Sequence, residues 1–282
     1  MPTVRANGLD IAYDLHGAGP PLVMLHGASS IGSDDFAPQI PLFSKAFQLI
    51  LPDARGHGRT RWDPADGFRH DWLVDDLAAF VDELGLGTFH LLGFSMGAMT
   101  ALQYGSRFAE RLRTVVIVGI TTQREPRTSV ARRLMDPRRA ETDPDWGRAL
   151  ARRHDAGQGE GAWRRLLPLI AADVAVQPLL SPRDLHAIDA PALIACGDRD
   201  PFVPVDHAWG IQRQLPDSRL LVVPGTGHEV MTKRPGLVNE ALSGFYRQTE
   251  ETARARAERA THGPVVVGGA QAGARPNEKE DR

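Results

Sequence analysis

The pentapeptide Gly93-Phe94-Ser95-Met96-Gly97 has the residue types and spacing that can hold a nucleophile at a sharp turn. It follows an apolar run at 88–92 and opens a segment that is expected to be helical. Glycines two positions before and after the serine remove side chains that would clash in such a corner. The serine hydroxyl would then be exposed at a helix N-terminus. The alternative is a glycine-rich turn with an incidental serine, and the strand-turn-helix context favours the nucleophile.

A serine hydroxyl is a weak nucleophile, so it needs a base that is oriented by a third group. His228, in a glycine-rich loop after the last expected strand, is the candidate base, and a surface-loop histidine is the alternative. Two carboxylates follow the expected strand at 192–196. We expect Asp198 to cap the turn there and Asp200, two residues further out, to reach His228. The chain order Ser95, Asp200, His228 is the one associated with this nucleophile turn.

An oxyanion that forms when the serine attacks a carbonyl needs two backbone N–H donors. Met96, the residue after the nucleophile, supplies one N–H. The second is expected from Ala28, because Gly27 allows a tight turn directly after the apolar run at 22–25. We interpret the neighbouring His26 as a structural histidine that braces this loop, and not as a catalytic base.

Other residues are candidates for the substrate pocket or for binding a cofactor. Ordinary core packing is the alternative for the aromatic residues and methionines among the pocket candidates, which are Ser29, Phe94, Met135, Trp146, Trp163, Val203 and Met231. The single cysteine, Cys196, excludes an internal disulfide and a cysteine-based zinc site. The histidines show no metal-ligand spacing and no phosphate-binding glycine motif follows a strand, so we expect neither metal nor cofactor.

The elements that must position these residues alternate between strands and helices. Continuous apolar runs predict strands buried on both faces at 11–15, 21–25, 47–51, 88–92, 114–118, 192–196 and 220–223. Helical apolar spacing is found at 71–84 and at 237–246. This alternation predicts an α/β fold whose core domain comprises residues 1–120 and 189–250.

Two segments depart from this pattern. Residues 121–188 are rich in proline, and their pattern predicts short amphipathic helices that form a cap insertion. Within them, residues 121–170 hold eleven arginines against seven acids, which either attract an anionic substrate or simply form solvated helix faces. Residues 251–282 are expected to form a disordered tail, although 252–259 could extend the last helix and 265–267 could dock as a short strand.

The composition limits the class of protein. The chain has 282 residues and a formal net charge of -2, which gives no support to nucleic-acid binding. No run approaches the ~18 apolar residues that a membrane span needs, and the first residues lack a secretory signal, so we expect a cytoplasmic protein that does not bind a membrane. The sequence leaves the oligomeric state undetermined.

Taken together, these motifs resemble the α/β-hydrolase-fold enzymes. Ser95, Asp200 and His228 match the catalytic triad of that superfamily, 26–27 match its oxyanion loop, and 53–58 resemble its structural Asp-x-Arg-Gly-His-Gly loop. The resemblance covers about residues 1–250. It implies a mostly parallel eight-stranded sheet flanked by helices, with a helical cap inserted after strand six. It also implies a cofactor-free hydrolase for a small-molecule carboxylic ester or lactone.

Within that superfamily, the layout is similar to small carboxylesterases, enol-lactone hydrolases and methylesterases of aromatic polyketide pathways. Ser95 argues against the epoxide hydrolases and haloalkane dehalogenases, because those relatives use an aspartate nucleophile. Hydrolases that cleave a C–C bond in vinylogous diketones share the serine triad, but 28–30 match their glycine-rich loop poorly. A ligand-binding receptor on the same fold is the second alternative.

Overall fold

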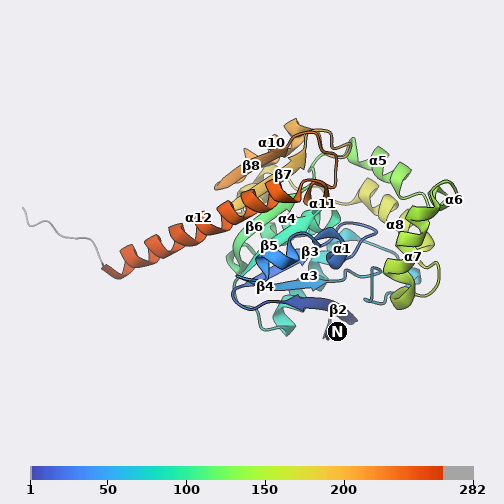
Figure 1. Ribbon diagram of the computed structural model, residues 1–282, viewed down its shortest axis with the longest axis horizontal. Coiled ribbons are helices and arrows are strands. Elements are labelled where there is room, and N and C mark those ends of the chain that lie inside the picture. Colours follow the sequence, from blue (N-terminus) through green and yellow to red (C-terminus); the bar gives the residue numbers. More distant parts are fainter. Residues whose placement is uncertain (1, 263–282) are drawn as a thin grey trace, which may run out of the picture.

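The computed structural model describes residues 2–262, and Figure 1 shows the arrangement of their helices and strands. One sheet of eight strands has the order β1-β2-β4-β3-β5-β6-β7-β8. The strands β3 to β8 pair in parallel, whereas β1 and β2 join one edge in antiparallel register. Their bounds are β1 Thr3–Ala6, β2 Leu9–His16, β3 Pro21–Leu25, β4 Gln48–Pro52, β5 Phe89–Phe94, β6 Leu112–Val118, β7 Ala192–Gly197 and β8 Ser218–Val223.

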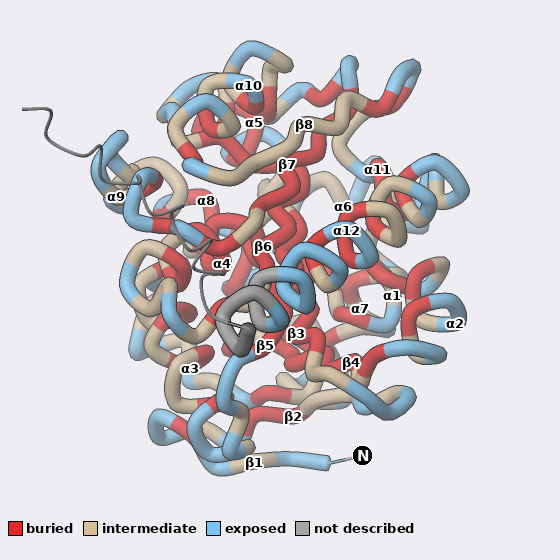
Figure 2. Tube along the Cα trace, turned by 90° about the vertical axis from the view of Figure 1, so that its left-hand side faces the viewer, coloured by how far each residue is buried: buried red, intermediate tan, exposed pale blue. Residues whose placement is uncertain are grey.

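Helices cover both faces of the sheet, so the central strands are buried while the outer sides of the helices are exposed (Figure 2). The core helices are α1 Gly32–Asp35, α2 Ile40–Phe43, α3 His70–Glu83, α4 Met96–Arg107, α10 Val205–Gln212, α11 Val230–Lys233 and α12 Pro235–His262. Those between β6 and β7 are α5 Arg127–Leu134, α6 Arg139–Thr142, α7 Pro144–Gln158, α8 Trp163–Val176 and α9 Pro182–His186. Short 3₁₀ turns lie at Pro64–Asp66 and Ala109–Arg111.

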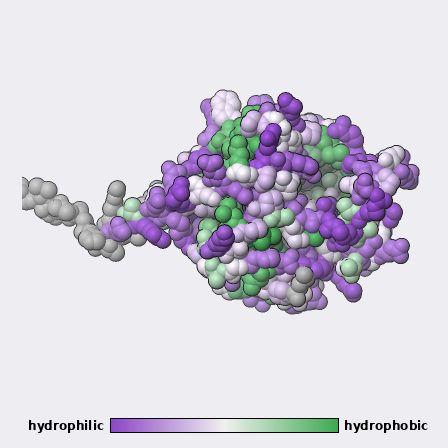
Figure 3. Space-filling view, viewed as in Figure 1, coloured by the Kyte–Doolittle hydropathy of each residue, from purple (hydrophilic) through white to green (hydrophobic). Residues whose placement is uncertain are grey.

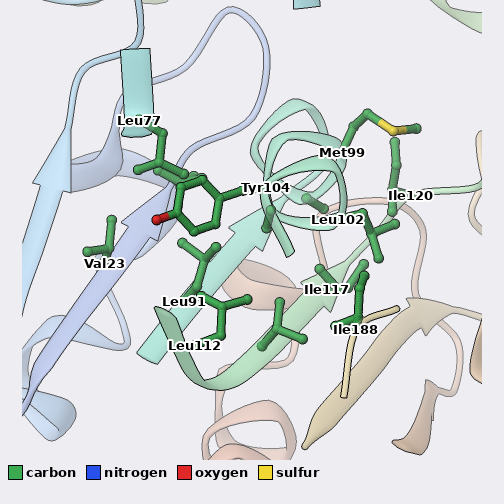
Figure 4. Close-up of a cluster of buried hydrophobic side chains, with 14 of the residues drawn as sticks. Val23, Leu77, Leu91, Met99, Leu102, Tyr104, Leu112, Ile117, Ile120 and Ile188 are labelled. Atoms are coloured by element: carbon green, nitrogen blue, oxygen red, sulfur yellow. The ribbon is translucent and has the colours of Figure 1, made fainter. Parts of the chain in front are cut away.

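The hydrophobic core is divided by the sheet into two main layers. On one face, side chains of α3, α4 and α10 pack against the strands, and Figure 4 shows Leu77, Tyr104 and Leu102 in this layer. On the other face, α12 packs against the opposite side of the same strands. Because each central strand contributes to both layers, its sequence is continuously apolar and does not alternate.

The predicted α/β-hydrolase fold is confirmed, and each of the seven strands expected from apolar runs is present. The sequence analysis did not predict strand β1, because only one of its four residues is buried and one is an arginine, so it has no continuous apolar run. The helices α5 to α9 occupy the segment where short amphipathic helices were expected. Among the described residues, no helix is long and apolar enough to cross a membrane, and hydrophilic residues dominate the face shown in Figure 3.

The last helix is longer than its apolar pattern indicates. Apolar side chains at Val238, Leu242, Phe245 and Tyr246 are buried against the sheet, and this stripe ends near Thr249. The helix nevertheless continues to residue 262 and extends away from the sheet (Figure 1), so the first part of the expected disordered tail is helical. The expectations for 263–282, including a docked strand at 265–267, lie outside the described residues.

We predict that a chain ending after residue 250 keeps its melting temperature within about 3 °C of the full chain, since residues 251–255 are all exposed. A chain ending after residue 244 loses Phe245 and Tyr246, whose burial contributes about 3–5 kcal/mol each. Its Tm should fall by at least ~10 °C in a thermal melt. A similar fall for the first truncation would show that residues beyond 250 stabilise the fold.

Candidate active site

Ser95 lies at the junction of β5 and α4 with a φ of 52°, a left-handed conformation that is unusual for a residue with a side chain. The two flanking glycines are required by close backbone contacts. A Cβ atom on Gly93 would lie 2.2 Å from the Gly97 carbonyl oxygen, and one on Gly97 would lie 2.2 Å from that of Leu25. The structure therefore forms the sharp turn that the sequence predicts and stores strain at this residue.

The side chains of His228 and Asp200 reach Ser95 from the ends of two other strands. His228 follows β8, and its Nε2 lies 2.9 Å from the Ser95 hydroxyl oxygen. Its Nδ1 lies 2.8 Å from Asp200 Oδ2, in the loop after β7. With Nδ1–H donating to the carboxylate, Nε2 is left free to accept the serine hydroxyl. The carboxyl ends of parallel strands share one edge of the sheet, which brings these three distant residues together.

The two aspartates after β7 have different environments. The Asp200 side chain is fully buried, and its second oxygen accepts hydrogen bonds from the backbone N–H groups of Phe202 at 2.8 Å and Val203 at 3.3 Å. Asp198 is exposed and accepts the backbone N–H of Thr226 at 3.0 Å. Backbone hydrogen bonds hold the pKa of Asp198 below its usual value. Asp200 is thus the residue oriented toward the histidine, and Asp198 ties the two loops together.

Two backbone N–H groups beside Ser95, those of Ala28 and Met96, make no hydrogen bond within the described residues. In the loop after β3, the Gly27 N–H donates to Asp35, the Ser29 N–H to His57 and the Ser30 N–H to the Gly27 carbonyl. Within residues 2–262, neither the Ala28 nor the Met96 N–H has a hydrogen-bond acceptor. Both border the same cavity as Ser95. This is the pattern expected of donors reserved for a substrate oxyanion.

Three buried histidines brace this loop and the neighbouring loop at 53–58, although the sequence analysis assigned such a role only to His26. The His26 Nε2 accepts the Ala54 N–H at 3.0 Å, and its Nδ1–H donates to the Gly27 carbonyl. His57 and His154 likewise accept backbone N–H groups, at 3.1 and 3.0 Å. Burial holds the pKa of His57 well below its ordinary value and lowers that of His154 to about 4. Both rings therefore remain neutral acceptors at neutral pH.

Asp35, which the sequence analysis missed, fixes the other side of the loop. Its carboxylate accepts the Gly27 N–H at 2.8 Å and the Ser30 hydroxyl at 2.6 Å. Burial raises its pKa despite these bonds. An aspartate nine residues after His26 has no sequence signature, because its function depends on the loop folding back onto α1.

A cavity above Ser95 separates the sheet edge from α5 to α8. It encloses about 1410 Å³ with its open mouth, and its lining includes four of the seven expected pocket residues, namely Ser29, Phe94, Met135 and Trp146. The expectation was wrong for Trp163, Val203 and Met231, which are buried in the core at 1–2% exposure. Trp163 packs between Leu150 and Leu167, so it supports the cavity wall from behind.

The sequence analysis also missed polar residues of this cavity, in particular Arg127, Asp173 and Gln177. No sequence signal distinguishes Arg127 from the other arginines of its segment. In the described part of the chain, no group of three or more histidine, cysteine or acidic side chains is placed to hold a metal ion.

Comparison with known proteins identifies the family. The model of the alpha/beta hydrolase fold matches residues 20–160, and that of the TAP-like proteins matches residues 172–257. The chain belongs to the α/β-hydrolase family. It is 30% identical over 276 residues to a non-heme haloperoxidase of Rhodococcus erythropolis, an alignment that covers 87% of this chain and 99% of the relative.

Further relatives have hydrolytic activities. The chain is 27% identical to the serine hydrolase BPHL of Mus musculus, over 86% of this chain and 84% of the relative. A solved structure of Est816, described as an N-acyl homoserine lactone degrading enzyme, is 27% identical and superposes with a TM-score of 0.71. That superposition covers 86% of this chain and all of Est816. These findings support a hydrolase and leave its substrate class open.

We predict that the free energy of unfolding falls as the pH drops below about 6.5. Four buried histidines have lowered pKa values because burial disfavours their charged form: His57, His70 (about 3), His90 (about 4) and His154 (about 4). Below pH 6.5 the unfolded chain binds protons that the folded chain excludes at these histidines, and each group costs up to ~1.4 kcal/mol per pH unit. Asp35 and Asp173, whose pKa values are raised by burial, act in the opposite direction but are two groups against four. Urea unfolding at pH 7, 6 and 5 measures this slope.

The matched variants are His154→Gln and His186→Gln. The first removes one buried histidine and should make the slope shallower by up to ~1.4 kcal/mol per pH unit. The second removes an exposed histidine and should leave the slope unchanged. A free energy of unfolding that stays constant from pH 7 to 5 would contradict the assignment of neutral, buried rings.

Proposed function

We propose that this protein is a cofactor-free serine hydrolase that cleaves a carboxylic ester or lactone through an acyl-enzyme. The observation that carries the proposal is the chain of hydrogen bonds from Asp200 through His228 to Ser95, at 2.8 and 2.9 Å. This geometry supplies a nucleophile, a base and a group that orients the base.

In the first half of the proposed reaction, the Ser95 oxygen attacks the substrate carbonyl carbon. Its proton passes to Nε2 of His228, and the imidazolium is stabilised by the buried Asp200 carboxylate. The carbonyl oxygen becomes an oxyanion that accepts the free N–H groups of Ala28 and Met96. When the intermediate collapses, the C–O bond to the leaving group breaks, and His228 donates its proton to the departing alcohol oxygen.

In the second half, water replaces the alcohol. His228 removes a proton from the water as it attacks the acyl carbon, and the same two N–H groups hold the second oxyanion. Breaking the bond to the Ser95 oxygen releases the carboxylic acid and returns the proton to the serine. For a lactone, the alcohol and the acid are parts of one product. Phe94 and Phe202, whose rings lie 5.1 and 4.5 Å from the His228 ring, limit the movement of the base through this cycle.

The size and lining of the cavity favour a mid-sized, partly apolar substrate. Met135, Trp146 and Ile170 present apolar surface from the helices above Ser95. We therefore propose faster hydrolysis of p-nitrophenyl acetate, p-nitrophenyl butyrate or a small lactone than of p-nitrophenyl palmitate. In a side-by-side comparison of kcat/KM, a tenfold lead for palmitate would contradict this substrate class, and a tenfold lead for a vinylogous diketone would indicate a C–C bond hydrolase.

We predict that Ser95→Ala and His228→Ala each lower kcat for p-nitrophenyl butyrate by roughly 10⁴-fold. The first change removes the proposed nucleophile, and the second removes the base that accepts its proton. Thermal melts should show that both variants remain folded. If Ser95→Ala keeps near-normal turnover, Ser95 is not the nucleophile. If the wild-type protein turns over no ester or lactone, although Ser95→Ala binds one, the result would favour a ligand-binding receptor on this fold.

The two aspartates after β7 provide a matched pair for the third triad position. Asp200→Asn should lower kcat by roughly 10⁴-fold, because it removes the carboxylate that orients and stabilises the His228 ring. Asp198→Asn should lower kcat by less than ~10-fold, since Asp198 contacts only the loop backbone. The measurement is kcat at pH 8 for variants of comparable Tm. A reversed ranking would assign the orienting role to Asp198.

A further inference from the structure

The side chain of Arg127 is buried in the cavity wall and makes no hydrogen bond at two of its nitrogen atoms within the described residues. Arg127 is the first residue of α5 and is only 4% exposed. Its Nε and Nη2 atoms are shielded from solvent and make no hydrogen bond within residues 2–262. Burial lowers the pKa of its guanidinium to about 10, so the group remains charged at neutral pH.

Such an arrangement is unfavourable in the protein alone. A buried cation whose N–H groups make no hydrogen bonds has lost hydration that nothing replaces. An anion bound beside Arg127 would offset this cost.

The other arginines of the cavity already have partners. Arg153 donates to Asp34 at 2.7 Å and to the Ser29 carbonyl at 3.1 Å. Arg139 donates to the Leu134 carbonyl and lies over the Trp146 ring at 4.5 Å. Arg127 is therefore the cavity arginine, within the described chain, whose hydrogen-bonding capacity is left for a ligand.

The acidic side chains of the cavity leave the N–H groups of Arg127 without an acceptor in the described structure, although the charge of Asp173 attracts the guanidinium from beyond ion-pair distance. Asp173, on α8, accepts the backbone N–H of His70 at 3.1 Å and makes no ion pair with Arg127. Burial raises the pKa of Asp173 to about 6. Asp35 is held by the loop after β3, and Glu229 is exposed and lies 3.7 Å from Lys233.

A second polar group without a partner lines the same cavity. Gln177, at the end of α8, is 3% exposed, and its side-chain carbonyl oxygen is buried without a hydrogen bond. Arg124 ties the start of α5 to α8 by donating to the Val174 carbonyl at 3.1 Å. Because the side-chain oxygen of Gln177 makes no hydrogen bond that would be broken, the Gln177 amide can turn its NH₂ group toward an acceptor.

We propose that Arg127 binds a carboxylate group of the substrate, so that the natural ester or lactone is anionic at the end that lies against α5 and α8. The class of reaction rests on the proposed function, whereas the binding of the carboxylate does not. A guanidinium can hold a carboxylate through two parallel N–H···O bonds, and one unpaired arginine matches a single negative charge. The site thus selects half-esters of dicarboxylic acids or carboxylated lactones over neutral ones.

The probes are monomethyl and dimethyl esters of adipic, pimelic and suberic acid, which differ in one methyl group and hence in one charge. Calorimetry with Ser95→Ala measures their binding without turnover. At the chain length that fits, the monomethyl ester should bind at least about 30-fold more tightly than the dimethyl ester, as expected for a buried charge pair. Equal binding of both esters at all three lengths would overturn the proposal.

Arg127→Met in the Ser95→Ala background should remove this preference while leaving the dimethyl ester within about threefold. Arg133→Met is the matched control, because it removes the same charge from an exposed position on the same helix. It should preserve the preference. If Arg127→Met fails to fold, Arg127→Lys, which keeps the charge but not the fork, should weaken the preference. Loss of affinity for both esters alike would mean that Arg127 acts only through the structure.

The active enzyme separates the two proposals. A higher kcat/KM for the monomethyl ester, lost in Arg127→Met, supports both. Binding preference without turnover of any ester would preserve the carboxylate site and reject the proposed hydrolysis. Turnover of both esters without a binding preference would support the proposed hydrolysis and reject the carboxylate site. Competition by inorganic phosphate as strong as that of monomethyl adipate would reject the selectivity for a carboxylate.

Discussion

The close approach of α4 to the end of β3 is the constraint on which the candidate site depends. A Cβ atom at Gly97 would lie 2.2 Å from the Leu25 carbonyl oxygen, so only glycine allows the helix to start there. The Gly97 N–H then donates to the His26 carbonyl at 3.1 Å. The close approach of Gly97 to the end of β3 therefore places the strained turn at Ser95 next to the loop that contains the Ala28 N–H.

The loop after β3 and the neighbouring loop at 53–58 are held by histidine rings that accept backbone hydrogen bonds. His26, His57 and His154 accept backbone N–H groups through ring nitrogens, which only a neutral imidazole can do. For His57 and His154, burial favours the neutral ring by opposing the charged form. The backbone donors proposed for the oxyanion are therefore fixed by side chains that take no part in the proposed chemistry.

The cavity shows how a functional requirement can oppose stability. An unpaired buried arginine and an unpaired buried amide both cost free energy in the empty protein. Natural proteins retain such groups where a ligand satisfies them. Arg127 and Gln177 lie on the two helices that face Ser95 across the cavity, so the same wall that encloses the substrate can also orient it.

Local sequence patterns predicted seven of the eight strands, the Ser95 turn, and His228 and Asp200 as the side chains that line up with Ser95. These features depend on short-range rules: apolar runs, glycines where a turn excludes side chains, and polar residues directly after strands. Only the tertiary structure decided which histidines brace the loops and that Asp35 holds the loop after β3. It also decided that Trp163, Val203 and Met231 lie in the core, and that Arg127 is buried with two nitrogen atoms that make no hydrogen bond. Those outcomes depend on segments far apart in the chain packing together, and burial and pairing are properties of that packing rather than of any local motif.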